Sequence, residues 1–212
     1  MRVALVFDPD RRPSKELRAA LAEHELTEVP MQADATRTLT EILLASPRVV
    51  FLACVRPQPT LAALLHEFGI AYTGASPKLA LLCEDQTRVL AALARDRVPT
   101  ADGAPDLTAL VIGANSGLQV VLPRLPPALL PHRAALTETA KRACGALGLD
   151  SYGQVEMRLA DGRPAVVAVR AAPWTEALTE EPYWTALLAR GEKVSDVVDR
   201  LVGAAEERKR RF

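Results

Sequence analysis

The first third of the chain alternates short apolar runs with helix-like segments, and this alternation restricts the fold more than any other feature. Residues 3–7 and 48–54 have the composition of buried strands, and 27–30 and 70–73 that of shorter strands. Between them, apolar residues recur at helical spacing. Repeated strand–helix–strand units are typical of parallel sheets, so residues 1–76 are predicted to form an α/β domain with a doubly wound parallel sheet.

The remainder of the chain predicts antiparallel strands packed on helices, so the whole fold is expected to be α/β in two parts. Two hairpins are predicted, at 107–122 and at 152–169, and the second turns at Asp161-Gly162. Four prolines between residues 123 and 131 argue against regular structure in that segment. Helices are predicted at 77–97 with a break near 83–85, at 136–147 and at 194–211.

Charge and composition exclude several classes of function. The chain has 26 Lys and Arg against 26 Asp and Glu, so no overall field attracts nucleic acid or an anionic membrane. Aromatic residues make up 4% of the chain, which leaves few for base stacking. No apolar run approaches membrane-spanning length, and the first residues do not read as a signal peptide. Three widely spaced cysteines, Cys54, Cys83 and Cys144, are expected to be reduced core thiols of a cytoplasmic protein.

Five segments keep, in order along the chain, the motif pattern of a known enzyme family. Residues 69–76 (GIAYTGAS) are similar to the motif Gly-Ile-Pro-Tyr-Thr-Gly-Ser, 98–100 (VPT) to a Leu-Pro-Thr strand, and 110–123 to the hairpin that follows. Residues 151–157 (SYGQVEM) and 168–173 (AVRAAP) are similar to a hairpin that reads Gly-Tyr-Ala-Arg-Val-Asp-Phe and then Glu-Val-Asn-Pro-Asn-Pro. Together these segments resemble the D-alanine–D-alanine ligases of the ATP-grasp superfamily.

The resemblance implies a division into two domains. Residues 1–76 would form a pre-ATP-grasp-like N-terminal domain, and residues 77–212 a reduced ATP-grasp C-terminal lobe. The family inserts a nucleotide-binding subdomain after its Leu-Pro-Thr strand, whereas this chain has only residues 101–106 at that point. Glycine-rich loops supply the N–H groups that hold phosphate. Their loss predicts that this chain binds no cofactor, although the parent family uses ATP and Mg²⁺.

The residues that the family uses as metal ligands are largely replaced. In the ligases an Asp, a Glu and an Asn of the last hairpin hold two Mg²⁺ ions through oxygen atoms. The corresponding residues here are Glu156, Ala168 and Arg170. Ala168 offers no oxygen and Arg170 places a cation where a dication belongs. Glu156 is therefore the one plausible remnant of the site, and no metal is predicted.

Two positions that are cationic in the family are neutral in this chain. Gln154 stands where an Arg faces the developing oxyanion, and Gln86 stands where a Lys reaches the phosphates. A positioned oxyanion donor is worth about 3–4 kcal/mol of transition-state stabilisation in other enzymes. No catalytic residue is therefore expected, and the five replaced positions are interpreted as vestigial.

These losses favour a non-catalytic relative of the ligases, with a binding, regulatory or scaffold role. A first alternative is an ATP-dependent carboxylate–amine ligase that a partner chain completes, with Glu156 holding a single Mg²⁺. A second is a sensor of small anions or metabolites that uses the vestigial cleft, with Arg170, Glu156 and Arg11 as ligand-binding residues. The resemblance also implies a homodimer, because the family's N-terminal domains commonly pair, and a scaffold role implies a protein partner.

Other conspicuous residues have structural explanations. Trp174, Tyr183 and Trp184 are expected to fill the gap left by the missing subdomain or to cover a subunit contact. His66 lies on an apolar helix, where a structural histidine is favoured over a ligand. The charged segment 206–211 is interpreted as a frayed, solvated helix end.

Overall fold

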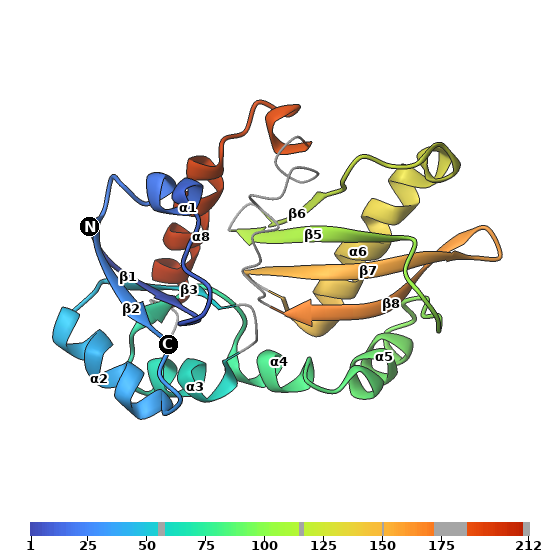
Figure 1. Cartoon of the computed structure of the whole chain (residues 1–212). Coiled ribbons are helices and arrows are strands. Elements are labelled where there is room, and N and C mark those ends of the chain that lie inside the picture. The colour runs from blue at the N-terminus through green and yellow to red at the C-terminus, as the bar shows by residue number, and fades with distance from the viewer. Residues whose placement is uncertain (55–57, 115–116, 150, 172–185, 210–212) are drawn as a thin grey trace.

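The computed structural model describes residues 1–54, 58–114, 117–149, 151–171 and 186–209. Two four-stranded sheets lie beside each other within it (Figure 1). The first, sheet A, is parallel, as the strand–helix alternation predicts, and its strand order is β2-β1-β3-β4. Its strands are β1 (Arg2–Phe7), β2 (Glu25–Pro30), β3 (Val49–Ala53) and β4 (Ala71–Tyr72).

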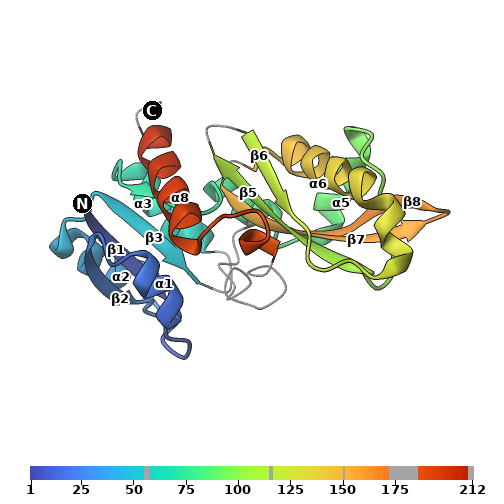
Figure 2. The ribbon, with the colours of Figure 1, turned by 90° about the horizontal axis from the view of Figure 1, so that it is seen from above.

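Helices cover both faces of sheet A, and for this reason β1 and β3 are buried on both sides. The helices α2 (Ala35–Ala45) and α3 (Pro59–Glu67) share a core cluster with one face. The opposite face packs on α1 (Lys15–Ala20) and on α8 (Val194–Lys209), the last helix of the chain. Figure 2 shows α1 and α8 on this side of the sheet.

Sheet B is antiparallel with strand order β6-β5-β7-β8. The second hairpin turns where the sequence predicts, at Asp161 (φ 49°) and Gly162 (φ 73°), and two successive positive φ angles match a two-residue hairpin turn. One face of the sheet shares a core cluster with three helices. The strands are β5 (Leu107–Ala114), β6 (Gly117–Val121), β7 (Tyr152–Ala160) and β8 (Arg163–Ala171). The helices are α4 (Pro77–Leu82), α5 (Gln86–Arg95) and α6 (Arg133–Leu147).

The proline-rich segment contradicts its prediction of irregular structure. Pro127–His132 forms a 3-10 helix, η1, which leads directly into α6. Pro127 lies in the first turn, where a missing N–H costs nothing, and the amide of Leu129 donates to the carbonyl of Pro126 at 2.9 Å. The buried side chain of Leu129 anchors this short helix to the core. The prediction of irregular structure from proline content was therefore wrong for residues 127–132.

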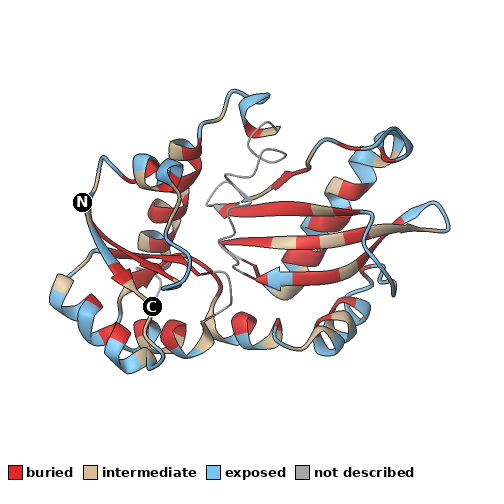
Figure 3. Cartoon of the chain, viewed as in Figure 1, coloured by how far each residue is buried: buried red, intermediate tan, exposed pale blue. Residues whose placement is uncertain are grey.

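Helix α8 connects the two halves of the molecule. Its apolar face lies in the same core cluster as residues of sheet A, such as Leu5 and Phe51, and residues of sheet B, such as Leu110 and Tyr152. Figure 3 shows buried residues along the strands of both sheets and along α8. A C-terminal helix was predicted, but its position on the N-terminal sheet was not. The division at residue 76 stays a prediction, and α8 packs across it.

Backbone hydrogen bonds fix the short connection between α5 and β5 to the β7–β8 hairpin. The amide of Ala101 donates to the carbonyl of Val166 at 2.9 Å, and the amide of Val166 donates to the carbonyl of Pro99 at 2.8 Å. The carboxylate of Asp106 accepts from the amide of Leu159 at 2.8 Å. Residues 101–106, where the family would insert a subdomain, thus form a closed connection held to both strands.

Candidate functional site

Two of the sequence-predicted site residues form an ion pair on the face of sheet B opposite α6. The Nε of Arg170 donates to Oε1 of Glu156 at 2.8 Å. Strand register places Gln154 opposite Arg170 and Ala168 opposite Glu156, so alternation along the strands brings all four to the same face. The fold therefore brings together four of the six candidate residues, Gln154, Glu156, Ala168 and Arg170.

The pair leaves little for a metal ion to bind. The side chain of Glu156 is 16% exposed and one of its oxygens is occupied by Arg170, whose own side chain is 58% exposed. Its cross-strand neighbour Ala168 has no oxygen in its side chain. No group of three or more His, Cys, Asp or Glu residues within the described ranges has a geometry suited to a metal. The residues present do not fit the two-Mg²⁺ site of the ligases, which needs several oxygen ligands per ion.

Gln86 has a structural role that its sequence position does not reveal. It is the first residue of α5, which begins at an Asp85 cap. Its amide nitrogen donates to the carbonyl of Val169 at 3.0 Å, and its amide oxygen accepts from the Val169 N–H at 3.2 Å. The side chain thus imitates a neighbouring strand at the open edge of β8. A lysine or an arginine cannot make this paired contact, because neither has an acceptor.

The remaining candidate, Arg11, comes from the N-terminal half of the chain. It is exposed in the loop after β1, where its amide donates to the carbonyl of Asp8 at 2.9 Å. Within the described ranges no hydrogen bond or ion pair joins Arg11 to Glu156 or Arg170. The ligand-binding role predicted for Arg11 therefore remains a prediction. Trp174, Tyr183 and Trp184 fall outside the described residues.

The three cysteines are buried free thiols, as the sequence predicts. Burial raises the pKa of Cys54 and of Cys144 to about 12, and also raises the pKa of Cys83. A thiol is a nucleophile only as the thiolate, so these residues are inert at neutral pH. Their side chains pack in the core.

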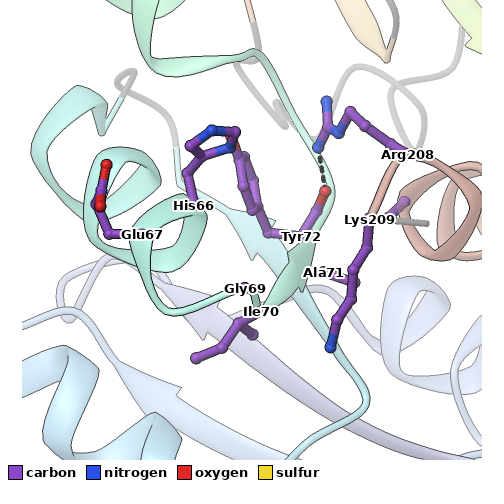
Figure 4. Close-up of a pocket in the computed structure, with 9 residues that line it drawn as sticks. His66, Glu67, Gly69, Ile70, Ala71, Tyr72, Arg208 and Lys209 are labelled. Atoms are coloured by element: carbon purple, nitrogen blue, oxygen red, sulfur yellow. Dashed lines mark hydrogen bonds between the residues drawn. The ribbon is translucent and has the colours of Figure 1, made fainter. Parts of the chain in front are cut away.

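The charged end of α8 is solvated only in part: Glu207 and Lys209 are exposed, whereas Arg208 is bonded within the protein, and residues 210 and 211 lie outside the described residues. Arg208 donates to the carbonyl of Gly74 at 3.0 Å and to that of Tyr72, and its guanidinium lies 4.6 Å from the centre of the Tyr72 ring. Figure 4 shows it beside a cavity of about 370 Å³ at the edge of β4. His66 and Lys209 also line this cavity. Because Arg208 donates to the backbone carbonyls of Tyr72 and Gly74, we interpret it as a clamp, that is, a side chain that holds the segment between the two halves in place.

Two further hydrogen bonds join the start of β7 to sheet A. The buried hydroxyl of Tyr152 donates to the carbonyl of Leu52, and burial raises the pKa of this phenol. The hydroxyl of Ser151 accepts from the amide of Gly74 at 2.8 Å.

No described helix is long and apolar enough to cross a bilayer.

Comparisons with known proteins identify the fold. No protein-family model and no curated protein matches the chain. The D-alanine–D-alanine ligase of Bacillus anthracis in complex with ATP matches with a TM-score of 0.75 at 13% identity, over 100% of this chain and 98% of that chain. The ligase of Coxiella burnetii matches with 0.75 at 10% identity, over 100% and 97%. The Kluyveromyces lactis urea carboxylase matches with 0.72 at 11% identity, over 97% of this chain and 22% of that chain.

These identities are low, so the likeness is one of fold. It confirms the predicted two-part α/β architecture and the resemblance to the D-alanine–D-alanine ligases at the level of fold.

Proposed function

We propose that this chain, which has the fold of the D-alanine–D-alanine ligases, is a non-catalytic protein with a binding, regulatory or scaffold role. The observation that carries the proposal is the ion pair between Glu156 and Arg170. The family's hairpin would present oxygen ligands here, whereas this chain presents one carboxylate that its own arginine neutralises. A triphosphate with its Mg²⁺ ions would meet too few ligands on this face.

Two other features support the proposal. The connection at residues 101–106 is hydrogen-bonded to the β7–β8 hairpin, so no nucleotide-binding subdomain follows α5. Gln86 is bonded to the backbone of β8 and cannot reach a phosphate without breaking that contact. Each change removes a different part of the nucleotide site, and their combined effect is the loss of both phosphate donors and metal ligands.

Titration calorimetry of ATP with Mg²⁺ into the purified chain tests the proposal, and no binding in the micromolar range is expected. Micromolar, metal-dependent binding would contradict it and would favour the alternative of a ligase completed by a partner chain. In that case phosphate release from ATP should require Glu156 and should disappear in the Glu156→Gln variant.

A double variant checks that the ion pair is the cause. Replacing Ala168→Glu and Arg170→Asn restores two oxygen-bearing side chains beside Glu156. The double variant is expected to bind Mn²⁺ more tightly than the wild type, as measured by electron paramagnetic resonance. Equal, weak binding by both proteins would show that other features exclude the metal.

The proposal extends to a cytoplasmic homodimer. Large apolar side chains are exposed on the N-terminal half, among them Leu44 (81%) and Phe68 (57%), and a self-contact would cover such residues. Light scattering coupled to size-exclusion chromatography should give twice the mass of the 212-residue chain. A monomer at all concentrations tested would refute the dimer and leave the non-catalytic role untouched.

A further inference from the structure

A groove of about 720 Å³ lies between the segment that follows β6 and the segment 186–190. Its volume is in the range typical of small-molecule sites. Leu122, Leu125 and Leu130 contribute apolar surface, and the first two are buried in the core while Leu130 is 52% exposed. The groove is distinct from the Glu156–Arg170 pair, because neither residue of that pair lines it.

Three arginines line the groove: Arg124, Arg133 and Arg190. They come from the loop after β6, from the first turn of α6 and from the turn at residue 190. Among the described residues that line the groove there is no Asp or Glu, and within the same ranges no ion pair involves any of the three arginines. By contrast, Arg170 on sheet B is neutralised by Glu156. Three like charges around an apolar surface repel one another, and a bound anion would relieve that repulsion.

The start of α6 adds to the positive potential. Arg133 is the first residue of this 15-residue helix, whose first turn contains no acidic residue and whose N-cap, His132, makes no side-chain capping bond. A cation is disfavoured at a helix N-terminus, because the helix dipole is positive there. No side chain of this first turn neutralises Arg133.

The opposite wall of the groove is held in place by the backbone. The amide of Gly191 (φ 73°) donates to the carbonyl of Leu188 at 2.9 Å, and the amide of Glu192 donates to that of Leu187 at 3.1 Å. This is the hydrogen-bond pattern of a glycine-terminated helical turn. The buried side chain of Leu187 anchors the turn to the core, so Arg190 projects from a fixed position.

We propose that this groove is a binding site for a small amphipathic anion, with a carboxylate or phosphate head held by Arg124, Arg133 and Arg190 and an apolar body against the leucines. Arginine suits both head groups, since its planar fork donates two parallel hydrogen bonds to their oxygens. The inference does not rest on the proposed non-catalytic role, because the groove is built from residues outside the family's metal hairpin.

Titration calorimetry with four eight-carbon probes, octanoate, octyl phosphate, octanol and octylammonium, tests the site. One molecule of octanoate or octyl phosphate should bind per chain, and the tighter of the two identifies the preferred head group. Octanol and octylammonium should bind at least about tenfold more weakly, since they lack the charge-assisted contact. Equal binding of all four probes would overturn the proposal, as would inorganic phosphate binding as tightly as octyl phosphate.

Variants locate the site. Arg133→Gln and Arg190→Gln should each weaken anion binding about tenfold. Arg163→Gln is the matched control, because Arg163 is an exposed arginine at the start of β8 and does not line the groove. Circular dichroism shows whether each variant is folded, and all three sites are exposed. Anion binding that survives in an Arg124→Gln, Arg133→Gln, Arg190→Gln triple variant would refute the assignment.

Discussion

At the scale of single residues, two substitutions within one hairpin decide the chemistry of the sheet B face. Arg170 forms an ion pair with Glu156 at 2.8 Å, and Ala168, the cross-strand neighbour of Glu156, has no oxygen in its side chain. Gln86 shows the same principle from another element. Its side chain pairs with the backbone of Val169 at the edge of sheet B. Arg170 and Gln86 are thus both bonded within the protein.

Gln86→Ala should destabilise the protein by about 1–3 kcal/mol, because it leaves the N–H and carbonyl of Val169 without their partners. Gln86→Glu should also destabilise, since a carboxylate accepts from the Val169 N–H but cannot donate to its carbonyl. Urea unfolding measures both changes. Thr87→Ala, at an exposed neighbouring position, is the control and should change stability by less than about 0.5 kcal/mol. If Gln86→Ala is as mild as this control, the edge contact does not stabilise the fold.

The buried thiols predict how stability depends on alkaline pH. The folded-state pKa of Cys54 and of Cys144 is raised to about 12 from an ordinary value of 9.0. Between pH 9 and 12 the unfolded chain therefore binds fewer protons than the folded chain, and stability falls as pH rises, by up to about 1.4 kcal/mol per thiol and pH unit. Urea unfolding from pH 8 to 10.5 should show this decline. A Cys54→Ala, Cys144→Ala variant should lose stability at every pH but show a shallower decline, and an unchanged slope would assign the effect to other groups.

At the scale of elements, short connections are fixed by specific hydrogen bonds, as the helices and strands are. The 101–106 connection is an example, because Arg158 of β7 donates to the carbonyl of Asp102 at 2.8 Å and packs over Gly103. Gly103 has a φ of 111°, which disfavours any side chain. The Pro127–His132 helix is a second example, since it carries the chain from the end of sheet B into α6.

Two glycine-to-alanine substitutions should have opposite effects on stability. In Gly103→Ala the φ of 111° strains any side chain, and Arg158 must give up its present position because its terminal nitrogen would lie 2.3 Å from the new Cβ, so a loss of about 1–3 kcal/mol is expected. Gly203 lies inside α8 with no atom within 4 Å of a new Cβ, so Gly203→Ala should stabilise by about 0.5–1 kcal/mol. Thermal and urea unfolding measure both. A Gly103→Ala variant as stable as the wild type would show that the connection yields without cost.

At the scale of the whole molecule, α8 makes the two halves one folding unit. Its buried residues share a core cluster with both sheets, and Arg208 clamps the segment between the halves. The two halves would otherwise be joined mainly through α4 and the few hydrogen bonds of Ser151 and Tyr152. The C-terminal helix therefore fixes how the sheets sit relative to each other.

Calorimetry should show a single unfolding transition for both halves, with equal calorimetric and van't Hoff enthalpies. Leu201→Ala removes a side chain of α8 that is 1% exposed and should cost about 2–5 kcal/mol while keeping one transition. Leu188→Ala, at a residue that is 48% exposed, is the size-matched control and should cost far less. Two separate transitions in the wild type would show that α8 does not couple the halves.

The sequence by itself determined the elements and the fold class, because periodicity, caps and turn residues act over a few neighbouring positions. The parallel sheet agrees with the strand–helix alternation, although the strand order was not predicted, and the turn at Asp161-Gly162 followed from residues that accept a positive φ. The motif spacing also indicated the ligase fold, which the structural comparisons confirm. It identified Glu156 and Arg170 as a group, although not as an ion pair.

Only the tertiary structure decided the contacts between residues far apart in the chain. The pairing of Gln86 with Val169, the clamp of Arg208 on Gly74 and the groove with Arg124 and Arg190 each depend on how whole elements pack. Local sequence sets the conformation of a segment but not which distant backbone group or side chain it will meet. Those contacts arise only when both sheets close around α8, and for that reason the groove had no signal in the sequence.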